Sequence, residues 1–311
     1  MNKEKKCLIV IDSNSIIHRA FHALPPLATK KGELVNAVYG FLLVFFKAIR
    51  EFKPDFAAAA FDLPLPTFRH KKFKEYKIKR PPTPEGLLLQ IPKIKEVLKG
   101  FNVPVFEKEG FEADDIIGTI AKLAQKPGTS PSVETIILSG DLDVLQLVDS
   151  QTKVYALRKG VKDIVLYDEQ LVKEKYQGIG PEHIIEFKAL RGDPSDNIPG
   201  VKGIGEKTAI ELIKKFGNIE NLYLQLERKT EEIKGISARL KEVLLREKEK
   251  AFLSRELSEI QKNVSIDFNP QICRWGEYSQ EKIVQIFKDF EFYSLVARLS
   301  ELTFNKDSRE R

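Results

Sequence analysis

The sequence predicts an α/β fold with a mostly parallel central sheet flanked by helices, followed by a C-terminal helical domain. Short apolar runs alternate with segments of helical length through the first 180 residues. This alternation is typical of parallel strands that helices cover on both faces. From about residue 181 the strand-like runs nearly stop and helical patterns dominate. We therefore expect an α/β core over 1–180, a helical domain over 181–302 and a tail over 303–311.

Each expected element follows from a local pattern. Strands are predicted where an apolar run is short and bounded by turn residues. The expected strands are residues 7–11, 56–61, 103–106 and 134–138. Helices are predicted where apolar residues recur over a longer segment with helical spacing. The main expected helices of the first domain are residues 34–52, 85–100 and 113–126. The runs 153–157 and 163–167 predict a short hairpin at one edge of the sheet.

The composition narrows the classes of protein and of metal site. The chain has 311 residues, 42% of them hydrophobic, so it is long enough for a sizeable core. It has no apolar run of membrane-spanning length, and its first residues, MNKEKKCLIVID, become charged too early for a signal peptide. We expect a cytoplasmic protein that does not bind membranes. Two Cys and four His cannot form a Cys₄ zinc site and leave oxygen atoms as the main metal ligands.

One short segment carries the positive charge of the whole chain. The segment RHKKFKEYKIKR, residues 69–80, has seven Lys or Arg residues and one Glu. Its net charge of +6 equals the net charge of the whole chain. A solvated helix surface is the ordinary interpretation of such a segment. However, Phe68, Phe73 and Tyr76 are interleaved with the charges, which suits single-stranded nucleic acid, with phosphates on the cations and bases on the rings. Both interpretations stay open at this point.

Carboxylates follow the predicted strands. The residues concerned are Asp12, Asp62, Glu112, Asp114, Asp115, Asp141 and Asp143. Because the carboxyl ends of parallel strands meet at one edge of a sheet, these side chains are expected to lie close together. For the run FEADDIIGTIA the ordinary alternative to a metal site is an acidic cap on a surface helix, since acidic residues are common at helix N-termini.

A second acidic cluster, GDPSDN, adds Asp193 and Asp196 to the set. Taken alone it is an ordinary turn. Nine converging carboxylates would repel one another and some would bind protons, unless cations offset their charge. Oxygen ligands select Mg²⁺ or Mn²⁺ over zinc. Two such ions about 4 Å apart are the arrangement that activates water in phosphodiester hydrolysis. The sequence therefore predicts a two-metal hydrolytic site.

Taken in order, the motifs resemble the 5′-nuclease family, which includes flap endonucleases and the 5′→3′ exonuclease domain of bacterial DNA polymerase I. The stretches that carry the resemblance are IDSNSIIHRAFHALP, VNAVYGF, FDLPLPTFRHKKFKEYK, RPPTPE, FEADDIIGTIA, LSGDLDVLQLV and ALRGDPSDNIPGVKGIGEKTAIELI. The resemblance covers roughly residues 6–302. It implies a PIN-like 5′-nuclease core with a basic helical arch over about 63–95. It also implies a helix–hairpin–helix element over about 190–216 in the helical domain.

The resemblance assigns all nine carboxylates to the metal site. It assigns one Mg²⁺ chiefly to the group that includes Asp12, Asp62, Glu112 and Asp114, and it places Asp115 in the set of nine. It assigns the second to Asp141, Asp143, Asp193 and Asp196. Mn²⁺ is the expected substitute. The catalytic set implied by the resemblance is Asp12, Asp62 and Asp141, with Lys77 and Arg80 facing the scissile phosphate.

Several residues are expected to hold DNA. The segment PGVKGIGEKTAIELI, residues 199–213, predicts a tight turn followed by a helix whose first N–H groups can bind phosphate. A glycine-rich turn that only joins two helices is the alternative. The resemblance adds a K⁺ ion on the carbonyl groups of this loop. The full DNA-binding set is Arg19, Arg69, Lys71, Lys72, Tyr76, Lys77, Arg80, Gly200, Lys202, Gly203, Gly205, Lys207 and Thr208.

The function expected from the resemblance is a structure-specific 5′→3′ exonuclease and 5′-flap endonuclease acting in replication and repair. Its substrates would be DNA with a 5′ flap, a nick or a 5′ end, and RNA–DNA at primers. We expect a monomer, with a DNA polymerase as a partner. No polymerase-like sequence follows, which predicts a stand-alone protein, and a fragment of a longer polymerase is the alternative. The rival functions are a non-catalytic DNA-binding module and a toxin-like ribonuclease.

Overall fold

A six-stranded sheet forms the centre of the computed structural model, which describes residues 5–125, 133–228 and 235–302. The expected tail 303–311 lies outside these residues. The strands are β1 (Lys6–Asp12), β2 (Phe56–Ala60), β3 (Val105–Phe106), β4 (Val133–Ser139), β5 (Thr152–Lys159) and β6 (Asp163–Tyr167). Their order is β3-β2-β1-β4-β5-β6. The first five are parallel and β6 runs antiparallel to β5. The predicted sheet and edge hairpin are therefore confirmed.

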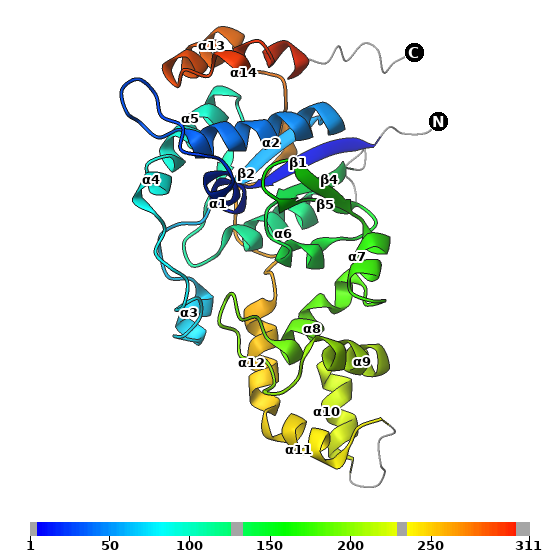
Figure 1. Ribbon diagram of the computed structural model, residues 1–311. Helices are drawn as coiled ribbons and strands as arrows, with labels where there is room; N and C mark the ends of the chain where they lie inside the picture. The colour runs from blue at the N-terminus through cyan, green and yellow to red at the C-terminus, as the bar shows by residue number, and fades with distance from the viewer. Residues whose placement is uncertain (1–4, 126–132, 229–234, 303–311) are drawn as a thin grey trace.

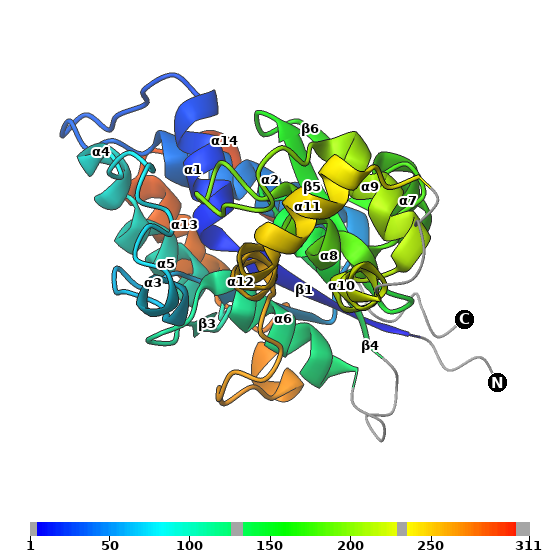
Figure 2. The same cartoon turned by 90° about the horizontal axis from the view of Figure 1, so that it is seen from below.

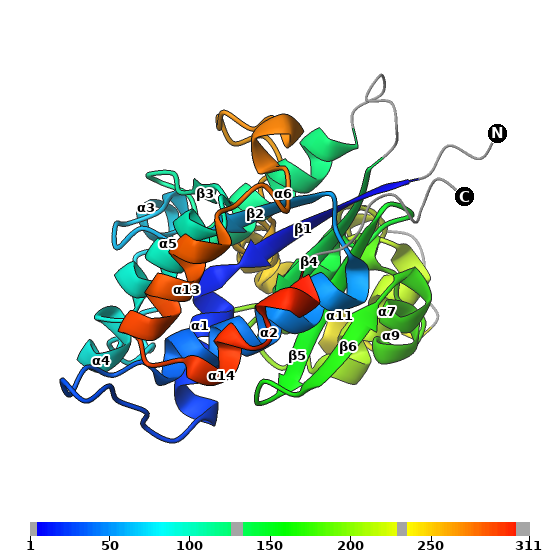
Figure 3. The ribbon, with the colours of Figure 1, turned by 90° about the horizontal axis from the view of Figure 1, so that it is seen from above.

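The central strand β1 is apolar on both faces, as its continuous apolar run predicts. Ile9 and Ile11 pack into a core on one side of the sheet. Leu8 and Val10 pack into a second core on the other side. In the first core lie α1 (Ser13–Ala23), α2 (Asn36–Phe52), α5 (Ile91–Gly100) and α13 (Gln280–Asp289). The second core includes α6 (Ala113–Ala124), and Figures 2 and 3 show the two sides of the sheet.

The helical region at the lower end of Figure 1 has its own apolar core. It comprises α8 (Ile184–Arg191), α9 (Glu206–Phe216), α10 (Ile219–Glu227), α11 (Ala238–Arg246) and α12 (Lys248–Ser258). The helix α7 (Glu169–Lys175) and the short 3₁₀ helix Pro181–His183 connect it to the sheet. Among the described residues, no helix is both long enough and apolar enough to cross a membrane.

The last part of the chain returns to the α/β core, which differs from the single helical domain predicted over 181–302. After α12 the chain forms α13 and α14 (Tyr293–Val296), at the top of Figure 1. Trp275 and Phe287 pack there with Phe45 of α2 and Phe101. These rings complete the buried face of α2 and α5. A helical pattern in the sequence does not reveal which core the helix joins.

The segment predicted as a helical arch is only partly helical. It contains α3 (Phe68–Lys72) and α4 (Glu85–Leu88), and the segment between them is not helical. Prolines explain the interruption, because Pro81, Pro82 and Pro84 cannot donate helical hydrogen bonds and they restrict the residues before them. The predicted helix 85–100 is likewise divided into α4 and α5, and Pro92 stands in the first turn of α5.

Two glycines with positive φ in the loop before α9 should differ in how much stability is lost when each is replaced by alanine. Gly200 has φ +62°, and an added Cβ would lie 2.3 Å from the backbone nitrogen of Gly192. Gly203 has φ +89° but has open space around it. Gly200→Ala should therefore lower the free energy of unfolding by about 3 kcal/mol or more, against about 1 kcal/mol for Gly203→Ala. Urea unfolding of both variants measures the difference, and equal losses would contradict the structure of this loop.

Candidate active site

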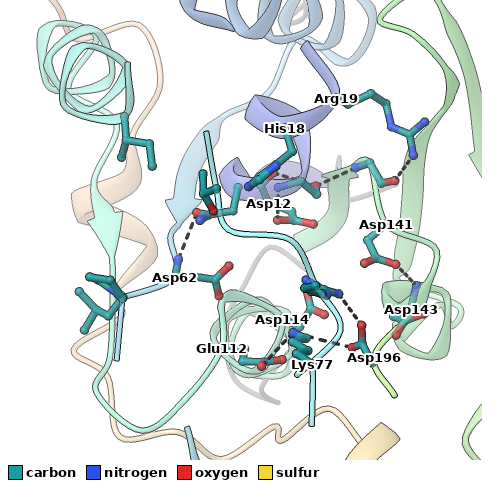
Figure 4. A pocket seen from close by; sticks show the side chains of 18 of the residues that line it. Asp12, His18, Arg19, Asp62, Lys77, Glu112, Asp114, Asp141, Asp143 and Asp196 are labelled. Atoms are coloured by element: carbon teal, nitrogen blue, oxygen red, sulfur yellow. Dashed lines mark hydrogen bonds and ion pairs between the residues drawn. The ribbon is translucent and has the colours of Figure 1, made fainter. Parts of the chain in front are cut away.

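A pocket of about 1000 Å³ lies at the carboxyl edge of the sheet. It brings together seven of the nine predicted carboxylates, and Lys77 and Arg80 line it as well. The seven are Asp12, Asp62, Glu112, Asp114, Asp141, Asp143 and Asp196. Figure 4 shows that these side chains come from several elements and surround one space. Residues more than 180 positions apart in the sequence therefore share one pocket.

The turn after β4 is tied to the end of β1 by Ser139. Its hydroxyl donates to Asp12 Oδ2 at 2.5 Å and accepts from the backbone N–H of Asp141 at 2.8 Å. Asp12 also caps α1, where its Oδ1 accepts from the Ser15 N–H at 3.3 Å. Ser139 is fully buried, so one serine fixes the two turns that carry Asp12 and Asp141.

The start of α6 brings two more carboxylates to the pocket and contacts a third, Asp62. Glu112 is the N-cap of α6, and Asp114 lies in its first turn. The N–H of Ala113 donates to Asp62 Oδ1 at 2.7 Å, which connects the residue after β2 to this helix. The free N–H groups at a helix start stabilise such charges.

Two basic residues of the arch segment contact these carboxylates. Lys77 Nζ lies 2.9 Å from Glu112 Oε1 and 3.8 Å from Asp196 Oδ2. Arg80 forms an ion pair with Asp196. Burial lowers the pKa of Lys77, but Glu112 and Asp196 more than offset this, so the pKa is raised and the lysine stays charged. Lys77 has φ +55°, an uncommon conformation for a residue with a side chain.

Lys188 is a site residue that the sequence analysis missed. It is buried, lies 2.8 Å from Asp193 Oδ2 and forms an ion pair with Asp143. Burial raises the pKa of Asp193, but Lys188 and Ser195 lower it to about 2. Asp193 therefore contacts the site through Lys188 and does not line the pocket. Nothing in its local sequence distinguishes Lys188 from the many other lysines of the helical region.

Asp115 is the other predicted metal ligand that does not line the pocket. Its carboxylate is fully buried and accepts from Arg69 at 2.7 and 2.8 Å. Arg69 is also buried, so it does not lie on the surface where DNA contact was expected. The sequence analysis gave the two residues separate roles, in metal binding and in DNA binding, whereas the structure pairs them with each other.

The predicted DNA-binding residues divide by exposure. Lys71, Lys72, Arg80, Lys202, Gly203, Gly205 and Lys207 are exposed, and Thr208 is partly exposed. Tyr76 and Gly200 are buried. Tyr76 places its hydroxyl 3.1 Å from both Glu112 Oε2 and Asp196 Oδ2. Arg19 is partly exposed at the pocket wall and donates to the carbonyl oxygens of Gly140 and Arg158.

The charges of the pocket are unfavourable without cations. Burial raises the pKa of Asp12 to about 6, although Ser139 and Ser15 donate to it. Burial also raises the pKa of Asp143 to about 6, and Lys188 offsets part of this. The pKa of Asp114 is raised by burial and by the charges of Asp12 and Asp141. Burial is the largest cause of all three shifts, so the ionised forms of these carboxylates are disfavoured, and a bound cation would stabilise them.

The donor set fits hard divalent cations. All the pocket carboxylates offer oxygen, which Mg²⁺ and Mn²⁺ prefer. Within the described ranges, no three His, Cys, Asp or Glu side chains stand together as a complete metal cage. Mg²⁺ keeps several waters and needs only one or two carboxylates, so the open arrangement is compatible with it.

Two sequence-family models match nearly the whole described chain. Residues 7–177 match the N-terminal resolvase-like domain of 5′-3′ exonucleases. Residues 179–281 match the C-terminal SAM fold of the same proteins. The chain belongs to the 5′-3′ exonuclease family. The predicted family and fold class are thereby confirmed, while the boundary at 180 stays a prediction.

Curated relatives extend the family assignment. The chain is 44% identical over 298 residues to DNA polymerase I of Bacillus subtilis, which is 96% of this chain and 33% of that protein. It is 36% identical over 300 residues to DNA polymerase I of Mycobacterium tuberculosis, which is 96% of this chain and 32% of that one. The chain thus spans about a third of the length of the curated relatives it matches.

Solved structures share the fold of this 5′-3′ exonuclease family member. The T5 D15 protein, co-crystallized with metal ions, has a TM-score of 0.67 at 19% identity, covering 92% of this chain and 99% of that one. The catalytic core of Rad2, in complex with a DNA substrate, has a TM-score of 0.58 at 19% identity, covering 96% and 93%. At this identity the likeness shows the fold alone.

The raised pKa of Asp114 predicts a pH-dependent gain in stability. In EDTA near pH 8, Asp114→Asn should raise the thermal midpoint by about 2–4 °C, because it removes a partly buried charge from among like charges. The folded-state pKa of Asp114 is raised, so lowering the pH protonates the wild-type carboxyl group and removes this destabilising charge. The gain should therefore shrink as the pH falls. Scanning fluorimetry measures it, with exposed Asp267→Asn as the control. A gain that is constant with pH would contradict the assignment.

Proposed function

We propose that the chain is a structure-specific 5′ nuclease that hydrolyses phosphodiester bonds of DNA next to a 5′ flap, a nick or a 5′ end. The observation that carries the proposal is the pocket itself. Seven carboxylates from the strand ends and from the loop after α8 meet there, with Lys77 and Arg80 beside them. A fold kept only for binding DNA would not require this concentration of acidic groups, which destabilises a protein without cations.

Two divalent cations, Mg²⁺ with Mn²⁺ as a substitute, would supply activation of water and stabilisation of the leaving oxygen when bound. The carboxylates of Asp12, Asp62, Glu112 and Asp114 would hold one ion. Those of Asp141, Asp143 and Asp196 would hold the other, with Asp193 acting through Lys188. Figure 4 supports this division, because Asp141, Asp143 and Asp196 lie on the opposite side of the pocket from Asp62 and Glu112. The ion pairs of Lys188 with Asp143 and Asp193 support the indirect role of Asp193.

Lys77 and Arg80 would bind and orient the scissile phosphate. Both are cations at the pocket wall, and each contacts a carboxylate at its rim. In a site of low dielectric, such cations stabilise the negative charge that develops on phosphate oxygens. The positive φ of Lys77 supports a functional role, since uncommon backbone conformations cluster at active sites.

The loop before α9 would hold the duplex. Gly205 is the N-cap of α9, an 11-residue helix, and the exposed Lys202 and Lys207 flank it. N–H groups at a helix start and nearby lysines bind phosphate without reading the bases. We propose a K⁺ ion on the carbonyl groups of this loop, together with Gly203 and Thr208 in the same DNA contact. Exposed Lys71 and Lys72 of α3 would contact the single-stranded part.

The relatives suggest the biological setting. They are bacterial DNA polymerases I, of which the matched region is one third. We propose that the chain acts as a monomer in the bacterial cytoplasm and removes flaps and RNA primers in replication and repair, together with a DNA polymerase. A labelled 5′ flap incubated with Mg²⁺ or with EDTA separates this proposal from a non-catalytic DNA-binding module, which would bind the flap and leave it intact in both.

Asp141→Asn tests the carboxylate site. The change removes one charge of the pocket and keeps the size of the side chain, so flap cleavage should fall by about 10³-fold or more while flap-DNA affinity in EDTA stays close to wild type. Cleavage is measured under single-turnover conditions in Mg²⁺, and affinity by fluorescence anisotropy. Wild-type cleavage by this variant would refute the site.

Lys77→Ala tests the role of the arch cation. Loss of a cation at the scissile phosphate should slow single-turnover cleavage by about 10²–10³-fold. Lys99→Ala removes an exposed lysine near the end of α5 and is the matched control, with no expected effect. An unchanged rate in Lys77→Ala would remove this residue from the mechanism and leave the metal site as it stands.

A further inference from the structure

We infer that Arg69 and Asp115 form a buried joint that positions the active site and that neither side chain binds metal or DNA. The inference rests on the proposed function and goes beyond it, because it concerns how Lys77 and Glu112 are held in place. Three parts of the chain meet at this joint. They are the basic segment 69–80, the start of α6 at residues 112–115, and the segment 257–261 at the C-terminal end of α12.

The guanidinium group of Arg69 is bonded on every nitrogen. Nη1 and Nη2 donate to the two oxygens of Asp115 at 2.7 and 2.8 Å. Nε donates to the carbonyl oxygen of Leu257 and Nη2 to that of Glu259, both at 2.8 Å. Nη1 also lies 3.5 Å from Glu112 Oε2. Arg69 lines the pocket, but only 2% of its surface is exposed and four of its five N–H groups donate hydrogen bonds within the protein.

The carboxylate of Asp115 also accepts hydrogen bonds on both of its oxygens. Besides the two bonds from Arg69, Oδ1 accepts from the N–H of Gln261 at 2.8 Å and Oδ2 from the N–H of Glu112 at 3.0 Å. Two oxygens with four donors have no lone pair left for a metal ion. The bond to the Glu112 N–H makes Asp115 the residue that fixes the backbone of a pocket carboxylate.

The joint determines both ends of the contact between Lys77 and Glu112. Lys77 follows Arg69 by eight residues in the basic segment, and Glu112 precedes Asp115 by three. The segment 257–261 is the common support. It is held in turn by Gln146, whose side chain donates to the Ser258 carbonyl and accepts from the Ile260 N–H, both at 3.0 Å. A shift at the joint would therefore move a cation and a carboxylate of the pocket relative to each other.

A lysine could not replace Arg69. The two parallel bonds to Asp115 and the two carbonyl contacts need the planar fork of a guanidinium group, and an ammonium group offers only a point charge. A second ion pair, between Lys72 and Glu256, joins α3 and α12 on the surface, where about half of each side chain is exposed. Exposed pairs contribute little, so this pair is the natural comparison for the buried one.

The test compares Arg69→Lys and Asp115→Asn with Glu256→Gln as the matched control. Single-turnover cleavage of a labelled 5′ flap in Mg²⁺ should fall by about 10–100-fold in the first two variants, as expected for groups that orient ligands. Flap-DNA affinity in EDTA should stay close to wild type in all three. Rates are measured well below each variant's thermal midpoint, so that every protein compared is folded.

Two measurements do not depend on activity. Hydrogen exchange should become faster in residues 73–80 of Arg69→Lys, including the Lys77 N–H that donates to the Asp196 carbonyl at 2.9 Å. Exchange in α2 should be unchanged. Mn²⁺ binding to the DNA-free protein, followed by its paramagnetic resonance signal, should weaken by about tenfold in Asp115→Asn although the variant keeps its other carboxylates.

The outcomes separate this inference from the proposed function. Wild-type rates and wild-type exchange in Arg69→Lys would overturn the joint, as would faster exchange spread equally over α2, which would mean a role in global stability only. If wild type itself does not cleave the flap, the proposed function fails, and faster exchange in residues 73–80 with weaker Mn²⁺ binding would still support the joint.

Discussion

The structure depends on holding like charges together at one edge of a sheet. Parallel strands deliver Asp12, Asp62 and Asp141 to the same side, and the helix start at Glu112 adds more. Coulomb repulsion and burial both act against this arrangement. Four basic side chains offset part of the repulsion among the carboxylates. Lys77 and Arg80 do so at the rim of the pocket, and Lys188 and Arg69 do so from behind the carboxylates. The rest of the charge is what makes the pocket suited to divalent cations.

The basic side chains do not act alike. Lys77 and Arg80 approach from a segment on the pocket side, so a phosphate could take the place of their carboxylate partners. Lys188 and Arg69 are buried behind the carboxylates, with exposures of 6% and 2%. Their bonds are internal, and replacing them by water would leave buried charges unpaired. The first pair therefore suits the phosphate contact proposed for it, and the second pair suits maintaining the shape of the site.

Much of this could be predicted from the sequence. Apolar runs such as 7–11 fix the strands, and the rule that parallel strands end at one edge places Asp12, Asp62 and Asp141 together. Lys188 could not be predicted, since its role comes from the distance between α8 and the turn at Asp143. The pairing of Arg69 with Asp115 could not be predicted either. The two residues lie 46 positions apart, and in the sequence every cation of the basic segment 69–80 looks exposed.

The return of α13 and α14 to the α/β core has a mechanical consequence. The helical region α8–α12 leaves the core before Ile184 and rejoins it after Ser258, so it is attached at two points. A body attached by one linker can swing in any direction, whereas two attachments restrict it to rotation about the line that joins them. The two connections, together with the ion pairs of Lys188 with Asp143 and of Arg80 with Asp196, therefore restrict how far the loop before α9 can move relative to the pocket.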